Sequence, residues 1–383
     1  MTKHKAVAEN VPHKKRQIKS LQLLRLAALT MVFLFHQNMV DESFSRLGVC
    51  LFFVLSGFLN AYHEYDREHQ SGVMNSIGFG VNKVRRIFPL HVIMLTIAFV
   101  LYTVSTWEVY LSEMPLSIIN SVIRYLTNLF LISGWIPHIP ILDRVLAEYN
   151  IATWFLSDCL LFYIFTPLII KCMHRIYDGK RQGFKPWITI LIIYLYTIVI
   201  NMFFVYRLGY MGAFWYIYSC PLSRIGDYLI GAQLGVIYLD YEHQRSQVHR
   251  SNRSWLPLVL LLLSAGLAFG LLYIGITTLS GPEKYVVSSG FYFTIPVCGL
   301  ILAMSFLSDI IDPEMEKYSL GKAVLWMGMI SPYAYLIQVP VINAVHGIYK
   351  RVADVRIGIW CIISLGITLI GSAIYKQWLD REA

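Results

Sequence analysis

The sequence predicts an all-α polytopic membrane protein, a bundle of about ten transmembrane helices with both termini in the cytoplasm. Of its 383 residues, 56% are hydrophobic and only 14% are charged, a composition too apolar for a soluble surface. Ten apolar windows approach the length of about 20 residues that a bilayer span requires. They are residues 21–40, 47–63, 87–106, 151–170, 187–206, 221–239, 255–279, 286–307, 322–346 and 356–376, with a weaker amphipathic stretch at 117–134.

The first window is expected to be a retained span and not a cleaved signal peptide. It follows a basic arm of residues 1–20 and ends in His-Gln-Asn-Met, without a small-residue cleavage site. Most Lys and Arg residues fall on the side of the arm, which indicates a cytoplasmic amino terminus. We therefore expect a basic cytoplasmic arm (1–20), one membrane domain (21–376) and a short cytoplasmic tail (377–383).

Composition and spacing also exclude several kinds of site. The six cysteines are scattered through apolar segments without Cys-x-x-Cys or Cys/His spacing, which argues against zinc and against a disulfide scaffold. The net charge of +9 follows from topology and does not indicate a nucleic-acid partner. We expect no metal site and no tightly bound cofactor.

Ionisable residues inside apolar windows are the first candidates for function, because burying them in a membrane is costly. Arg25 and His36 are eleven residues apart, so on one helix they lie about 20° apart around the axis and about 16 Å apart along it. Both are expected to face one interior path. The alternative, that each group snorkels or finds a neutral partner, remains open from this window alone. Arg224 and Asp227 are expected to pair across one helical turn.

Two further motifs follow the first window. Residues 52–57 read Phe-Phe-Val-Leu-Ser-Gly, in which Ser56 and its glycine allow close helix contact, although such contacts are also ordinary membrane packing. Ahead of the third window, Lys83, Arg85 and Arg86 form a basic cluster. It could hold phosphate groups, or anchor the chain to acidic lipid headgroups.

In combination and order, these motifs resemble the acyltransferase 3 family of integral-membrane acyltransferases, many of which O-acetylate bacterial surface polysaccharides. Arg25 and His36 match its Arg, ten residues, His pattern, residues 52–57 match its Phe-Phe-x-x-Ser-Gly element, and residues 83–89 stand where it has Arg-x-x-Arg before Pro. The later matches are Trp154-Phe-Leu156 with Phe162-Tyr163 and Pro167, Arg224 with Gly231 and Gly235, and Ser331-Pro-Tyr-Ala-Tyr335-Leu336.

The resemblance implies a membrane-bound O-acyltransferase of the bacterial plasma membrane. It implies transfer of an acetyl or other short acyl group from cytoplasmic acyl-CoA, with acetyl-CoA as the expected donor. The acceptor is a hydroxyl of a cell-surface carbohydrate or of its lipid-linked precursor. The implied catalytic residues are His36, as base or acyl-enzyme nucleophile, and Arg25; the implied acyl-CoA-binding residues are Lys83, Arg85 and Arg86; the supporting residues are Ser56, Asp158 and Arg224.

Departures from the family pattern shape the remaining expectations. Gln338 stands where the family often has a second His, so we expect no second catalytic His. Because no soluble domain follows the last window, any second acyl-transfer step is expected to use a separate partner protein. Acceptor contact is expected in the outer segment 107–150, which contains Trp135, Asp143, Arg144 and Glu148. A transporter or exporter of a glycan or small metabolite is the second function class, because intramembrane Arg and His also mark translocation paths.

Overall fold

The computed structural model describes residues 15–67, 69, 72–136, 148–177, 183–248, 255–279, 281, 284, 291–349 and 357–382, and its regular structure within these ranges is entirely helical. The helices are α1 (Leu21–His36), α2 (Glu42–Glu64), α3 (Val73–Val84), α4 (Phe88–Ser105), α5 (Trp107–Ser112), α6 (Leu116–Leu129), η1 (Ser133–Trp135), α8 (Thr153–Tyr177), α9 (Lys185–Tyr218), α10 (Pro221–Val248), α11 (Leu256–Thr277), α13 (Thr294–Phe306), α14 (Ser308–Lys317), α15 (Ser319–Tyr349) and α16 (Ile357–Glu382). Each of the ten predicted windows overlaps one of them, and the amphipathic stretch overlaps α6.

Seven of the described helices are long and apolar enough to cross a membrane: α2, α4, α8, α9, α11, α15 and α16. The pair α13 and α14 passes the same test together but is bent by 69°, which allows up to eight spans. α1 is apolar but shorter, and α10 contains the buried polar residues Arg224, Asp227 and Gln233. The prediction of a multi-pass helical membrane protein is confirmed in this form, while the count of ten and the side of the termini stay predictions.

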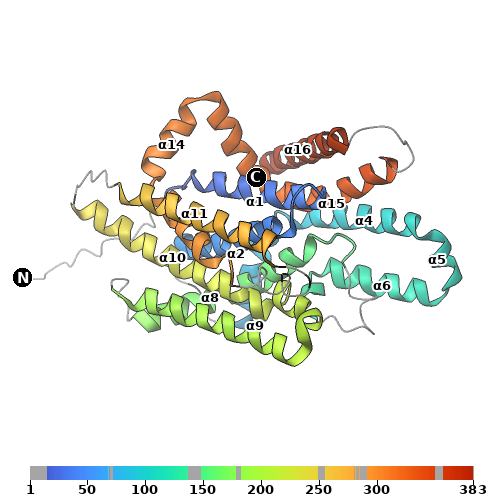
Figure 1. Cartoon of the computed structure of the whole chain (residues 1–383), viewed down its shortest axis with the longest axis horizontal. Helices are drawn as coiled ribbons and strands as arrows, with labels where there is room; N and C mark the ends of the chain where they lie inside the picture. The colour runs from blue at the N-terminus through green and yellow to red at the C-terminus, as the bar shows by residue number, and fades with distance from the viewer. Residues whose placement is uncertain are drawn as a thin grey trace, which may run out of the picture.

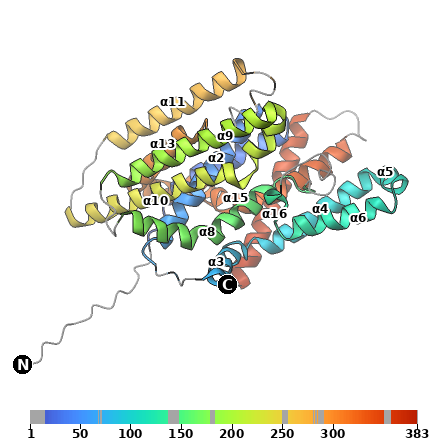
Figure 2. The same cartoon turned by 90° about the horizontal axis from the view of Figure 1, so that it is seen from below.

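Helix α2 forms the centre of the bundle, where 78% of its apolar window is buried. It packs most extensively against α10, and both helices lie amid α9, α13 and α15 in Figure 2. Glycines make this contact close: a Cβ atom on Gly57 would lie 1.9 Å from the Tyr228 carbonyl oxygen, and one on Gly231 would lie 1.9 Å from the Val54 carbonyl oxygen. The small residues of both motifs therefore bring two helix backbones together.

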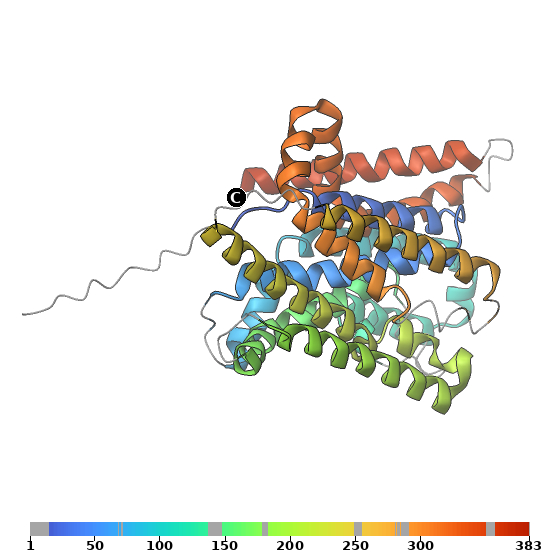
Figure 3. The ribbon, with the colours of Figure 1, turned by 60° about the vertical axis from the view of Figure 1, so that its left-hand side comes forward.

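Two units extend from this bundle. Helices α4, α5 and α6 reach beyond it at the right of Figures 1 and 2, and α14 with the start of α15 projects from it in Figures 1 and 3. The described end of the basic arm is attached to α14, where Asp312 accepts hydrogen bonds from the backbone N–H groups of Lys19 (3.0 Å) and Ser20 (2.6 Å). Arg16 pairs with Asp312 at 3.2 Å. A carboxylate distant in sequence thus fixes the backbone immediately ahead of α1.

Residues 64–86, which lie between the second and third predicted windows, contain the additional helix α3. It packs along α8, and a Cβ atom on Gly80 would lie 2.4 Å from the Ile164 side chain and 2.9 Å from its backbone nitrogen. Because α3 ends at Val84, this packing carries the basic cluster to the side of the bundle core.

Candidate functional site

A cavity of about 250 Å³ lies among α1, α2, α3, α8 and α15. Its polar lining includes one residue of the Arg25–His36 motif, one of the Phe-Phe-Val-Leu-Ser-Gly motif and two of the basic cluster. These residues are Arg25, Ser56, Lys83 and Arg86, joined by Tyr163 of α8. Aromatic and aliphatic side chains form most of the remaining wall. The fold therefore gathers residues from Arg25 to Leu336, up to 311 positions apart in the sequence, around one small, largely apolar space.

Arg25 enters this cavity from α1. Its Nη1 donates a hydrogen bond to Oε1 of Gln22, one turn earlier, at 3.3 Å, and the Tyr163 phenol lies within electrostatic range. Among the described residues, no carboxylate, Asp158 included, forms an ion pair with Arg25. A guanidinium group held in an apolar cavity without a carboxylate partner is suited to an anionic ligand.

Ser56 and Tyr163 face each other across the cavity, with 2.8 Å between the two hydroxyl oxygens. The packing of Gly57 against α10 fixes the orientation of α2 and so directs the neighbouring Ser56 toward α8. Sequence reasoning gave Tyr163 no role, although it lies in a segment that matches the Trp-x-Leu…Tyr…Pro element. The pair supplies two hydroxyl groups to the cavity lining.

The basic cluster is divided by the end of α3. Lys83 and Arg86 line the cavity, whereas Arg85 is exposed and does not. Lys83 forms an ion pair of 2.9 Å with Glu64 at the end of α2. The hydroxyl of Tyr375 in α16 donates a hydrogen bond to the Arg86 carbonyl oxygen at 2.8 Å, which fixes the connection between α3 and α4.

His36 lies at the end of α1 and does not line the cavity. Its ring lies 5.3 Å from that of Phe35, and no hydrogen bond joins it to another described residue. Between Arg25 and His36, the same helical face presents Leu29 and Val32, which are 5% and 1% exposed. The two ionisable groups therefore share a helical face, but packed aliphatic side chains separate them.

Arg224 and Asp158 form a second polar layer behind the cavity wall. The predicted pair of Arg224 with Asp227 is confirmed, with Nη2 and Oδ2 3.1 Å apart, and the guanidinium also lies 4.9 Å from the centre of the Phe53 ring. Asp158 is fully buried, and neither carboxyl oxygen has a hydrogen-bond partner among the described residues. Both charged groups lie within electrostatic range of Tyr335, whose ring lines the cavity.

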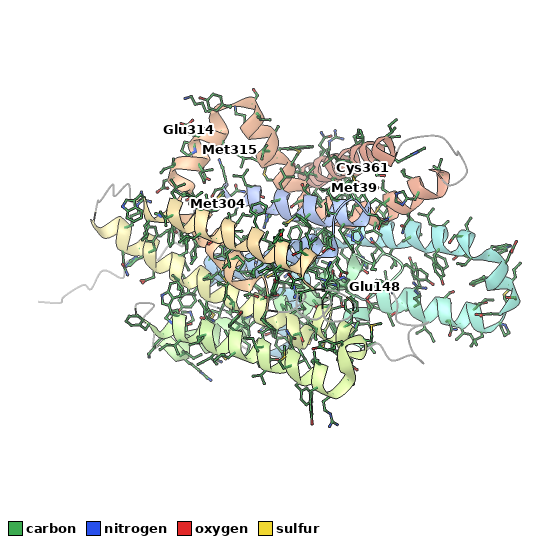
Figure 4. The ribbon with its side chains drawn as sticks, viewed as in Figure 1. Met39, Glu148, Met304, Glu314, Met315 and Cys361 are labelled. Atoms are coloured by element: carbon green, nitrogen blue, oxygen red, sulfur yellow. The ribbon has the colours of Figure 1, made fainter. Side chains whose placement is uncertain are left out.

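The segment expected to contact an acceptor is only partly described, since Asp143 and Arg144 lie outside the described residues. Nε1 of Trp135 donates a hydrogen bond to the Ser157 carbonyl oxygen at 3.0 Å, which attaches η1 to α8. Glu148, labelled in Figure 4, is turned inward, and burial raises the pKa of its carboxyl group to about 7. Within the described ranges, no group of three or more His, Cys, Asp or Glu side chains could hold a metal ion.

Comparison with known proteins relates this arrangement to one family. A family model described as "Acyltransferase domain", the acyltransferase 3 model, matches residues 18–376. Proteins named "Putative O-acetyltransferase" in Staphylococcus aureus strains COL, MSSA476 and MRSA252 are each 22% identical to this chain over an alignment of 386 residues. The alignment covers 96% of this chain and 57% of each relative. The chain thus spans little more than half the length of the curated relatives it matches. No solved structure matches it.

Proposed function

The chain belongs to the acyltransferase 3 family, and from that premise we propose that it is a membrane-bound O-acyltransferase of the bacterial plasma membrane. It moves an acetyl or other short acyl group from cytoplasmic acyl-CoA to a hydroxyl of a cell-surface carbohydrate or of its lipid-linked precursor. The observation that supports this function best is the meeting of Arg25, Lys83 and Arg86 at one apolar-walled cavity.

The charges at this cavity suit a donor with a polyanionic end and an uncharged arm. Lys83 and Arg86 are exposed, whereas Arg25 is half-buried. In the proposed topology of about ten spans with cytoplasmic termini, the exposed pair opens toward the cytoplasm, where acyl-CoA is made. The nucleotide phosphates then bind at Lys83 and Arg86, with Arg25 placed to bind the diphosphate deeper in the cavity. The pantetheine arm with its thioester enters the apolar part beyond them.

The residues supply what acyl transfer from a thioester to an alcohol requires. The acceptor oxygen bonds to the acyl carbon, the carbon–sulfur bond breaks, and the hydroxyl proton passes to a base and then to the departing thiolate of CoA. We assign the base to His36, whose imidazole nitrogen can accept the proton and return it. Formation and breakdown of an acyl-imidazole is the other route through the same residue. Ser56 and Tyr163 can donate hydrogen bonds to the thioester or to the thiolate.

The donor site is tested with full-length protein in lipid nanodiscs, by measuring binding of radiolabelled acetyl-CoA. Lys83→Ala and Arg86→Ala each remove a phosphate contact and are expected to raise the donor Kd about tenfold, since hydrogen bonds to charged groups contribute about 1.5–3 kcal/mol. Arg85→Ala is the matched control, because Arg85 lies in the same turn outside the cavity lining. If all three variants raise the donor Kd equally, the cluster attracts anions in general and does not form specific phosphate contacts in the cavity.

Catalysis is tested by transfer of the labelled acyl group to glycan in membranes of the host. His36→Gln is expected to abolish transfer and to leave donor binding intact, because His36 lies outside the donor cavity. Full transfer by this variant would remove His36 from the mechanism. Wild-type protein that binds no acyl-CoA would refute the proposed function and leave transport of a glycan or small metabolite as the remaining one.

A further inference from the structure

Three aromatic rings from three different helices meet at one end of the donor cavity. The ring centroids of Phe52 in α2, Phe155 in α8 and Tyr335 in α15 form a triangle. Phe52 lies 5.9 Å from Phe155 and 5.6 Å from Tyr335, and Phe155 lies 5.3 Å from Tyr335. All three side chains also line the cavity. Each ring therefore contacts the other two across the same space.

The order of residues along each helix places this triangle at the end of the cavity nearer the turn between α1 and α2. Phe52 is one helical turn closer to the α1–α2 connection than Ser56. α8 runs alongside α2 in the same direction, because the Trp154 ring lies near Phe53 and Tyr163 bonds to Ser56. Phe155 is therefore two helical turns closer to that connection than Tyr163. α15 runs in the same direction as α1, because Gly328 contacts Gln22 and Ile342 clusters with the later α1 residue Phe33. Tyr335 thus also lies toward the α1–α2 turn relative to the start of α15.

The space behind the triangle is filled. The Phe53 ring packs at a tilt against Phe155 with 4.5 Å between centroids. Val32, Val49 and Phe53 are at most 1% exposed. His36 lies beyond this layer, about 16 Å from Arg25 along α1. The donor cavity and His36 are therefore on opposite sides of the three rings and of the aliphatic residues packed behind them.

We propose that Phe52, Phe155 and Tyr335 form an aromatic gate that admits only a short acyl group from the donor cavity toward His36. This inference rests on the proposed function, because a donor in the cavity and a base beyond the rings can meet only when the rings move apart. Phe52 and Phe155 are half-buried, so their rings retain room to rotate. An acetyl group needs a small displacement of the rings, whereas each added methylene needs a larger one.

The size limit follows from packing at the closed end. A pocket that excludes one methylene discriminates by about 10- to 200-fold, and an octanoyl group is six methylenes longer than an acetyl group. Wild-type protein is therefore expected to bind acetyl-CoA at least about tenfold more tightly than octanoyl-CoA. Replacing one ring with a small side chain opens the end wall and should remove most of this preference.

The experiment measures competition of acetyl-, butyryl- and octanoyl-CoA against radiolabelled acetyl-CoA on the full chain in nanodiscs. Phe155→Ala is expected to lower the acetyl-to-octanoyl preference about tenfold or more. Phe155→Leu keeps more of the buried volume and is the second variant, with a smaller change in the same direction. Tyr335→Phe keeps the ring and loses only the hydroxyl, so its preference should equal that of the wild type.

Phe165→Ala is the matched control, because Phe165 lies in α8 but is 42% exposed and outside the cavity lining. The gate is refuted if the acetyl-to-octanoyl preference is unchanged in both Phe155 variants. It is also refuted if these variants lose the same affinity for all three donors. Failure of the proposed function gives a different result: the wild-type protein then binds none of the three thioesters. A preference that falls in the Phe155 variants and stays constant in Phe165→Ala and Tyr335→Phe supports the gate.

Discussion

Replacing Gly57 by Ala is expected to weaken the packing of α2 on α10 that orients one wall of the cavity. The added Cβ atom would lie 1.9 Å from the Tyr228 carbonyl oxygen, 2.8 Å from the carbonyl carbon and 3.0 Å from the Ala232 nitrogen. These are backbone atoms of α10, so no side-chain rotation relieves the overlap. The two helices must separate by more than an ångström before an ordinary contact is restored.

The cost can be assigned from packing energetics. Overpacking a core costs about 1–3 kcal/mol when side chains can adjust, and a backbone overlap places Gly57→Ala at the upper end, about 3 kcal/mol. Ala is favoured over Gly inside a helix by about 1 kcal/mol, which leaves a net loss of about 2 kcal/mol. Gly231→Ala meets the Val54 carbonyl oxygen at the same 1.9 Å. The double variant should lose less than the sum, because one separation relieves both overlaps.

The assay is thermal unfolding of purified protein in detergent, with acetyl-CoA binding as a second readout of cavity geometry. Gly266→Ala in α11 is the control, since no described heavy atom outside its own helix backbone lies within 4 Å of the added Cβ atom. It should be neutral, or more stable by up to about 1 kcal/mol through helix propensity. If Gly57→Ala unfolds at the same temperature as Gly266→Ala, the close approach of the two helices is refuted.

Three further predictions concern other parts of the chain. Burial raises the pKa of Glu148 from 4.5 to about 7, so its ionisation destabilises the fold as pH rises from about 4.5 through 7. At pH 8, Glu148→Gln should therefore raise the free energy of unfolding by up to about 3 kcal/mol, measured as a higher unfolding temperature. At pH 4.5 the unfolding temperature should change little. Asp312→Ala removes the acceptor of two backbone N–H groups ahead of α1 and should cost about 1–2 kcal/mol, seen as faster tryptic cleavage after Arg16. Tyr163→Phe leaves Ser56 without its hydroxyl partner and should lower the transfer rate about 100-fold at unchanged donor affinity.

The parts of the fold that local sequence determines were predictable. Apolar windows gave the positions of ten helices, and the three-residue spacing of Arg224 and Asp227 gave their ion pair, because both depend on the geometry of a single helix. The glycines of two motifs indicated close helix contact. Which helices make that contact was not predictable, because periodicity describes the faces of a helix and not its neighbours.

The candidate site depends on those neighbours. Ser56 and Tyr163 are 107 residues apart and meet only because α2 packs on α8. Likewise, spacing on α1 placed Arg25 and His36 on one face, but it could not show that Leu29 and Val32 of that face are packed shut against other helices. The sequence therefore identified most of the polar cavity residues, while the separation of His36 from them required the tertiary structure.

Glu64 offers a last test of the electrostatics at the mouth of the cavity. Its carboxylate is 6% exposed and pairs with Lys83 at 2.9 Å and with Arg67 at 3.2 Å. It therefore offsets part of the positive charge that a CoA phosphate would meet. The carboxylate also holds the Lys83 ammonium in place. This positioning favours donor binding, whereas the negative charge disfavours it. Glu64→Gln separates the two, because the amide oxygen retains an acceptor for Lys83 while the negative charge is lost.

If charge dominates, Glu64→Gln should tighten acetyl-CoA binding about two- to fivefold at low salt, corresponding to the 0.4–1 kcal/mol expected of a partly exposed ion pair. The gain should disappear at high salt, because screening weakens exposed charges most. Asp66→Asn is the control: it removes a nearby carboxylate that pairs with Lys15 at 2.9 Å and lies outside the cavity lining. Weaker donor binding by Glu64→Gln, with Asp66→Asn unchanged, would instead show that the carboxylate acts by positioning Lys83.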